Sequence, residues 1–408
     1  MKRVVLLSLI ASSMLMAGGY KIPETSLNGV ALGAANIAHN KSADAAYYNP
    51  ANMVFMEDKN HMELDLTYIG LEQINFKGSS TTSLGTTTNN VDINSKSESF
   101  LVPTVHYVSG KAGETRIGLS ITSPGGLSKR WDEQPAMGKA EEFTLKIIEI
   151  NPTVAIPIND KVAVAFGFRI VHSEGVVKAT PALNVAYQDM TGDSIDYGYN
   201  LALAYKPTSE LEMAFTYRSQ VNLTEDGTAD LKYPSPSING SYDTSVNIPL
   251  PAFASLALAY TLPSKTTIEF VYERNMWSAY KELNFEYTDA TAEAVFGTAK
   301  PKNWKDTNTF RLGITQELDS MTLMAGMVYD ETPVPDETIS YELPDSNSFS
   351  VSLGGRYQVN DKVEVGLAAL YSMRQSRSVN NENANDTVTG EFSNGNVLMI
   401  STGITYKF

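Results

Sequence analysis

Cysteine is absent from the 408-residue chain, and long apolar runs are rare. Without cysteine, no disulfide can hold the fold and no thiolate can do chemistry. Beyond the first residues there is no stretch of about 18 apolar residues, so no helix of the mature chain is expected to cross a bilayer. Stability therefore has to come from strand pairing and burial, in a secreted globular protein or in a membrane barrel.

Basic residues are fewer than acidic ones, 31 Lys and Arg against 46 Asp and Glu. Phosphate neutralisation requires clustered Lys and Arg, so nucleic acid is not expected as a partner. Catalytic motifs are also missing, because the sequence contains neither Gly-x-Ser-x-Gly nor His-Glu-x-x-His. The four histidines, at positions 39, 61, 106 and 172, fit no metal-ligand spacing. We therefore expect no enzyme activity, no metal and no cofactor.

The N-terminus has the order of residues of a secretory signal peptide. Lys2 and Arg3 precede an apolar stretch, residues 4–16, which is followed by Ala17 and Gly18. We expect cleavage after Ala17 or Gly18, and we take residues 1–17 as the signal peptide. The mature protein is then directed out of the cytoplasm.

From His61 onward the dominant pattern is alternation of apolar and polar residues, which is typical of strands with two unlike faces. One clear case has Phe349, Val351 and Leu353 alternating with Ser350 and Ser352. Alternation alone does not separate a soluble β-sandwich from a membrane barrel. The barrel is favoured by segments of about ten residues, by Tyr near the strand ends and by the C-terminal residue.

The last strand alternates up to the C-terminal residue Phe408. Leu398, Ile400, Ile404 and Tyr406 share its face with Phe408. A terminal Phe after such a run resembles the signal by which barrel-assembly machinery recognises outer-membrane proteins. We therefore expect the bacterial outer membrane as the location, with outer-membrane lipid and lipopolysaccharide around a monomer.

Counting the alternating segments predicts an all-β protein, a closed antiparallel transmembrane barrel of about 14 strands. Closure is required because an open sheet edge cannot be satisfied in lipid. The expected strands span residues 61–76, 98–109, 114–123, 142–157, 161–177, 193–206, 210–224, 250–262, 265–277, 303–317, 320–330, 346–359, 362–376 and 391–408.

Residues 18–58 do not alternate. They are rich in alanine and contain the triplet Asn49-Pro50-Ala51, a composition of short helices and turns that suits a confined space. Together with Gly29 and Gly33, this triplet resembles the N-terminal plug of the outer-membrane FadL and TodX family, which transports long-chain fatty acids and other hydrophobic compounds. The resemblance divides the chain into a signal peptide (1–17), a helical hatch in the lumen (18–58) and a transmembrane β-barrel (59–408).

Further matches follow in the order of the family. They are Gly118, Ile121-Thr122-Ser123 and Gly126-Leu127 in the third strand and its loop, Tyr217-Arg218-Ser219 in the seventh, Trp277, Lys305-Asp306 in the tenth, Asp330, Thr332-Pro333-Val334-Pro335 and Pro344-Asp345. The resemblance implies passive diffusion of hydrophobic ligands through a plugged barrel, with a lateral exit beside a kinked third strand. We expect the kink between Thr115 and Gly126, where Pro124 and two glycines would end strand pairing. An ordinary loop turn at these residues is the alternative.

A fatty acid needs an apolar channel for its tail and a cation for its carboxylate. Strand parity turns Lys305 and Arg311 toward the lumen, and it does the same for Arg218. Lys305 is the first candidate because it matches a lysine of the family motif; Arg218 and Arg311 follow. Alternatively, these cations pair with acidic residues of the lumen and merely fill the barrel. The acidic residues concerned are Glu212, Glu269, Glu273 and Asp306.

One departure from the family leaves the substrate open. Where the fatty acid transporter carries an arginine late in the fifth strand, this chain has Glu174. An uncharged hydrocarbon or an aromatic compound is therefore an alternative ligand for the same route. A general porin and a surface adhesin are further alternatives, but the alanine-rich segment before the barrel indicates an obstructed lumen.

Overall fold

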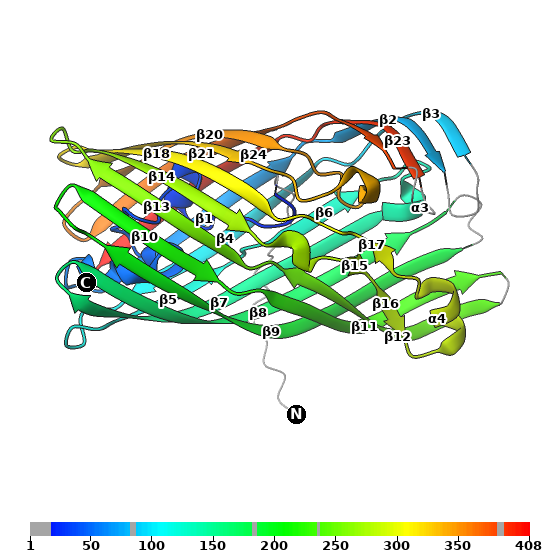
Figure 1. Cartoon of the computed structure of the whole chain (residues 1–408), viewed down its shortest axis with the longest axis horizontal. Coiled ribbons are helices and arrows are strands. Elements are labelled where there is room, and N and C mark those ends of the chain that lie inside the picture. The colour runs from blue at the N-terminus through cyan, green and yellow to red at the C-terminus, as the bar shows by residue number, and fades with distance from the viewer. Residues whose placement is uncertain (1–17, 82–86, 182–185, 235–236, 382–386) are drawn as a thin grey trace.

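The computed structural model describes residues 18–81, 87–181, 186–234, 237–381 and 387–408. The proposed signal peptide, residues 1–17, lies outside the described residues. Three sheets make up the described sheet structure, and Figure 1 shows a long barrel of tilted strands with a cap of short elements at one end.

The barrel wall is one closed sheet of eighteen strand segments in the described residues. Their bounds are β1 (His61–Leu71), β4 (Glu98–Val108), β5 (Arg116–Thr122), β6 (Gly126–Arg130), β7 (Glu142–Asn159), β8 (Val162–Ala179), β9 (Tyr187–Tyr205), β10 (Leu211–Arg218), β11 (Val221–Tyr233), β12 (Ile238–Leu250), β13 (Phe253–Thr261), β14 (Thr266–Asn275), β16 (Phe285–Tyr287), β18 (Thr307–Glu317), β19 (Met321–Asp330), β20 (Ser348–Gln358), β21 (Val363–Arg374) and β24 (Val397–Lys407).

Four wall strands are interrupted, as β5/β6, β10/β11, β13/β12 and β14/β16, so the segments form the fourteen strands that the sequence predicts. The wall closes where β1 pairs with β24 along its whole length, from His61 opposite Lys407 to Leu71 opposite Val397. Every pairing is antiparallel. Closure removes the unpaired edge that hydrocarbon could not satisfy.

The remaining elements lie mostly at the end of the barrel away from the C-terminus (Figure 1). A second sheet of four strands contains β2 (Ile74–Thr81), β3 (Thr87–Asn94), β22 (Arg377–Asn380) and β23 (Thr387–Asn394), and a small one contains β15 (Glu282–Leu283) and β17 (Lys300–Pro301). The short helices there are α3 (Met137–Ala140), η3 (Trp277–Ala279), α4 (Ala290–Phe296) and η4 (Asp336–Thr338).

Alternation along the wall strands follows the prediction. On β20, Phe349, Val351 and Leu353 are exposed on the outside, whereas Ser350 and Ser352 are buried inside. The same holds for β24, on which Leu398, Ile400, Ile404 and Tyr406 face outward. An apolar exterior around a polar, filled interior is the arrangement that a bilayer requires.

The hatch, defined as residues 18–58, occupies the lumen near the end at which the C-terminus lies (Figure 1). It contains α1 (Leu27–Leu32), α2 (Ala45–Tyr48) and η1 (Pro50–Phe55). Within the described residues, no helix is long and apolar enough to cross a membrane. The helices are instead almost fully buried against the inner face of the wall, where α1 contacts β19, β20 and β21.

Two glycines allow the hatch to pack this closely. Gly33 ends α1 in the left-handed conformation, with φ of 56°, and a Cβ there would lie 2.4 Å from Cγ2 of Val328 on β19. A Cβ on Gly29 would lie 1.9 Å from the hydroxyl of Tyr48. A side chain at Gly33 would push the hatch away from the wall, whereas one at Gly29 would displace Tyr48 within the hatch itself.

The wall holds the hatch through hydrogen bonds to carboxylates. Glu269 of β14 accepts from the backbone N–H groups of Ile37, Ala38 and His39, at 2.6, 2.7 and 2.9 Å. The His39 ring contacts Glu212 of β10. These three successive N–H groups have a fixed acceptor only while the hatch is seated.

We expect a Glu269→Ala variant to loosen the hatch, because hydrogen bonds to a charged group are worth about 1.5–3 kcal/mol each. Amide hydrogen exchange at residues 37–39 should become faster, and the ion conductance of the protein in planar bilayers should rise. A Glu210→Ala variant, in an exposed turn next to β10, is the matched control. Equal exchange rates in both variants and the wild type would contradict this anchoring role.

The outward face generates a second prediction. Leu256, in the middle of β13, is 56% exposed, and an Arg at such a lipid-facing position costs about 2–4 kcal/mol at the midplane. We expect Leu256→Arg to lower the free energy of unfolding in phospholipid vesicles by that amount. Asn239→Arg, at the far exposed end of β12, should have little effect. A similar loss in both variants would argue against a membrane belt at Leu256.

Candidate ligand-binding site

Arg218, the last residue of β10, is buried in the lumen, as parity predicts. Its guanidinium forms an ion pair with Glu149 of β7 and lies over the ring of Tyr47, 4.4 Å from the ring centroid. Arg169 of β8 contacts the same carboxylate, with Nη2 2.8 Å from Oε2. Arg218 therefore joins the wall to the hatch, and its charge already has a partner. Glu149 was not among the acidic partners expected from the sequence.

Arg311 of β18 also faces the lumen and is also paired. Its Nη2 lies 3.1 Å from Oε1 of Glu273, and its Nη1 donates to the carbonyl oxygen of Gly33 at 3.0 Å. Lys21 of the hatch shares Glu273 at 2.5 Å. Burial raises the pKa of the Glu24 carboxyl to about 6, although it lies 3.8 Å from Arg311. Both arginines thus match the alternative in which cations fill the barrel.

Lys305 does not face the lumen, and the parity prediction for it is wrong. Its side chain is exposed, and it precedes β18, which begins at Thr307. The reason is local: Trp304 turns inward to pack on Trp277, with ring centroids 5.0 Å apart. The backbone of Trp304 pairs with Tyr280 instead of the neighbouring wall strand. Alternation therefore cannot be extended back from Thr307 to Lys305.

The Asn49-Pro50-Ala51 triplet has a structural place in the hatch. The side chain of Asn49 caps η1 by accepting from the N–H of Ala51 at 3.1 Å, and it donates to the carbonyl oxygen of Ile37 at 2.9 Å. Pro50 occupies the first position of the helix, where no N–H is needed. All three residues are buried. The triplet holds two turns of the hatch together.

The third wall strand is broken inside the predicted range. Its two halves, β5 and β6, are separated by Ser123-Pro124-Gly125. β5 pairs with β4 only from Val105 to Val108, so the described residues 99–104 of β4 have ladder partners on β1 alone. The wall ladder is therefore interrupted between β4 and β6, on one side of the break.

The N-terminal end of the hatch pairs with the broken strand. The N–H of Ile22 donates to Pro124 O at 2.9 Å, and the N–H of Gly126 donates to Tyr20 O at 2.8 Å. Backbone groups that the wall leaves unpaired thus find partners in the hatch. Irregular backbone at membrane depth is tolerated where protein covers it in this way.

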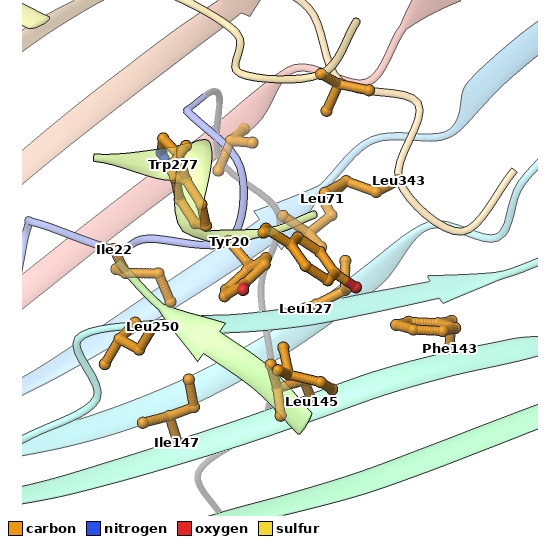
Figure 2. Packing of buried hydrophobic residues seen from close by; sticks show 14 of the residues in the cluster. Tyr20, Ile22, Leu71, Leu127, Phe143, Leu145, Ile147, Leu250, Trp277 and Leu343 are labelled. Carbon is orange, nitrogen blue, oxygen red and sulfur yellow. The ribbon is translucent and has the colours of Figure 1, made fainter. Parts of the chain in front are cut away.

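An apolar cluster fills the lumen beside the break (Figure 2). Its aromatic centre is Tyr20 on Trp277, with ring centroids 4.7 Å apart, and its aliphatic side contains Leu127, Leu145 and Leu250. These residues come from the hatch, β6, β7, β12 and the segment after β14. Buried apolar side chains therefore lead up to the interruption of the wall.

Lys129 of β6 is a buried cation beside this cluster that the sequence analysis did not select. It is 1% exposed, and its Nζ lies 3.4 Å from Oγ of Ser95. Among the described residues, no carboxylate lies within 4 Å of its ammonium group. The only signal in the sequence was a lysine directly after the predicted kink, within Gly126–Arg130. Lys129 is buried whereas Arg130 is exposed, and the sequence does not show this difference.

His106 and Ser120 form the one contact between a His ring and a Ser hydroxyl that we find in the described residues, with Nδ1 3.1 Å from Oγ. Both are fully buried, and Nε2 of His106 contacts the carbonyl oxygen of Thr25. The contact joins β4, β5 and the hatch. The described residues also contain no group of three potential metal ligands.

Comparison with known proteins agrees with this architecture. Residues 8–408 match the family model described as outer membrane protein transport protein (OMPP1/FadL/TodX). The long-chain fatty acid transport proteins of Salmonella typhi and of Escherichia coli K12 are each 24% identical, over 98% of this chain and 96% of theirs.

Solved structures show the same fold. The structure of a Pseudomonas aeruginosa FadL homologue has a TM-score of 0.84 at 19% identity, covering 98% of this chain and 100% of that one. The P. putida toluene transporter TodX has a TM-score of 0.70 at 16% identity, covering 94% and 98%. The chain therefore belongs to the outer membrane transport protein family (OMPP1/FadL/TodX), and it is a transport protein of the bacterial outer membrane rather than an enzyme.

Proposed function

We propose that this protein carries long-chain fatty acids, or similar hydrophobic molecules, by passive diffusion through the plugged barrel and sideways into the membrane. One observation carries the proposal: the apolar cluster of the lumen borders the break between β5 and β6, where β4 has no partner on that side. A molecule in the cluster then has a short path to lipid. Both the side chains that would surround the bound molecule and the lipid that it would enter are apolar.

The energetic argument is the cost of wetting. An aqueous pore would expose an apolar solute to water at about 25 cal/mol per Å² of apolar surface. A side exit avoids this exposure, because the molecule passes from buried side chains to hydrocarbon. The seated hatch supports the same route, since it occupies the lumen that a general porin would leave open. No observation favours an adhesin.

Lys129 is our candidate for the carboxylate of a fatty acid. A buried ammonium without an anionic partner is costly, and an incoming carboxylate would supply that partner. Arg218 and Arg311 are weaker candidates, since each already has a carboxylate partner. The Salmonella typhi and Escherichia coli relatives, named for long-chain fatty acids, support a substrate of this class. Lys305 stays a candidate on its sequence match alone.

Uncharged or aromatic hydrocarbons are a second candidate class by the same route. Glu174 of β8, where the fatty acid transporter has an arginine, is exposed and lies 3.8 Å from Lys146. It offers no cation to a carboxylate. The toluene transporter TodX shares the fold. We also expect, from Phe408, recognition by barrel-assembly machinery, and a monomer surrounded by outer-membrane lipid and lipopolysaccharide.

We expect Lys129→Met to reduce oleate uptake into cells about tenfold and to leave toluene uptake unchanged, because one charge-assisted hydrogen bond would be lost. Lys305→Ala is the matched variant with an exposed lysine; it should reduce oleate uptake only if the sequence match marks the head-group site. The measurement is the uptake of labelled oleate and toluene by cells with equal amounts of folded barrel, and it decides whether Lys129 or Lys305 binds the carboxylate. Normal oleate uptake in Lys129→Met would remove Lys129 from the site.

A disulfide across the rim of the break tests the lateral exit. The N–H of Lys96 donates to Arg130 O at 2.8 Å, and both side chains are exposed. Because the chain has no other cysteine, a Lys96→Cys/Arg130→Cys variant can be oxidised selectively. We expect uptake to fall on oxidation and to return on reduction, since the bridge prevents β6 from moving away.

The control is Asp230→Cys/Ser241→Cys, two exposed residues directly opposite each other on β11 and β12. Oxidation of that pair should not change uptake. If both oxidised pairs transport as well as their reduced forms, the exit does not require this rim to widen.

A further inference from the structure

A second feature of the lumen lies next to the apolar cluster. A narrow cavity of about 30 Å³ is enclosed by β7, β8, β9, β11, β12 and β16. Its walls are mostly apolar, with Phe143, Leu145, Met190 and Phe285, but they also include the carboxyl group of Glu225. No Lys or Arg is among the lining residues. The only ionisable group that lines this cavity is therefore an acid.

Glu225 is buried and only partly satisfied. It is 3% exposed, and its Oε1 atom is buried without a hydrogen-bond partner. In the described part of the chain it takes part in no ion pair. The titratable groups around it are Asp193, Asp196 and His172, and the hydroxyl of Ser173 is its hydrogen-bonding neighbour. A buried carboxyl group with a free acceptor atom is expensive unless a ligand or water satisfies it.

The chain makes room for this carboxyl group. A Cβ on Gly175 of β8 would lie 2.1 Å from Oε2 of Glu225, and a Cβ on Gly192 of β9 would lie 3.4 Å from its Cβ. Larger residues at position 175 would push the carboxyl group out of its place. Glycine therefore keeps Glu225 against the wall and leaves the cavity beside it free.

Thr244 of β12 provides a second polar atom in the same cavity. Its Oγ1 is buried without a hydrogen-bond partner, with Tyr287 close by. Thr244 is opposite Gly227, and Val246 is opposite Glu225, so Thr244 and Glu225 are diagonal neighbours on the lumenal face. Such residues have Cα atoms about 7–8 Å apart. One small polar group can lie between an acceptor and a hydroxyl at that separation.

We propose that this cavity binds the hydroxyl group of a neutral amphiphile, an aliphatic alcohol or a phenol. The ligand hydroxyl donates to Glu225 and accepts from Thr244, while its apolar part lies along Phe143, Leu145 and Met190. A carboxylate is disfavoured there by the like charge of Glu225 whenever Glu225 is ionised. The proposal rests on the proposed transport of hydrophobic molecules and adds a substrate class to it. The cavity holds one or two water molecules at most, so the flexible Met190 has to move for a larger group.

The test compares three probes of one shape: p-cresol, toluene and 4-methylbenzoate. Their affinities for the detergent-solubilised full-length protein are measured by equilibrium dialysis, with detergent alone as the blank. We expect the wild type to bind p-cresol about tenfold more tightly than toluene and 4-methylbenzoate most weakly. In Glu225→Ala the affinities for p-cresol and toluene should become equal. Glu225→Gln keeps an acceptor and removes the charge, so 4-methylbenzoate should bind more tightly than in the wild type.

Glu174→Gln is the control, because it removes an exposed carboxylate one residue from Gly175 and should change no affinity. Equal binding of p-cresol and toluene by the wild type would overturn the proposal, and so would a preference that survives in Glu225→Ala. Toluene and oleate uptake is measured in wild-type cells as a separate readout. Absence of the hydroxyl preference with normal wild-type uptake refutes the proposal for this cavity alone, whereas wild-type cells that take up neither compound would refute the proposed function itself.

Discussion

Every backbone N–H and C=O group of the wall needs a partner, because hydrocarbon on the outside offers none. The pairing of β1 with β24 meets this requirement by closing the sheet. At the break between β5 and β6 the wall cannot meet it, and Tyr20 and Ile22 of the hatch supply the missing backbone partners. The position of the hatch therefore compensates for the interrupted pairing of the wall.

The same reasoning explains why most lumenal charges are paired. Arg218, Arg311 and Glu269 each connect the wall to the hatch, through the ring of Tyr47, the carbonyl oxygen of Gly33 or a row of backbone N–H groups. Buried charges are tolerated when their hydrogen bonds are complete. Such residues are poor sites for a transported ligand, since a ligand would have to displace a hatch contact.

Among the described residues, two buried charged groups beside the apolar cluster take part in no ion pair. The ammonium group of Lys129 contacts the hydroxyl of Ser95, and Glu225 has a free acceptor atom in a cavity. The cross-strand partner of Lys129 is Phe143, which also lines the cavity of Glu225. A lumen of this kind can distinguish the head groups of molecules whose apolar parts are alike.

The sequence by itself determined the barrel, because alternation along a strand records which side faces lipid and which faces the lumen. It also marked the kink at Pro124 and the packed hatch around Asn49-Pro50-Ala51, through residues with restricted or compact backbones. Only the tertiary structure decided which charged residues form ion pairs with each other. Glu149 is far from Arg218 in the chain but contacts it in the lumen. The tertiary structure also corrected Lys305, since parity holds only inside a strand and β18 begins at Thr307. Burial and partner choice depend on contacts across the barrel, and one strand's pattern does not contain them.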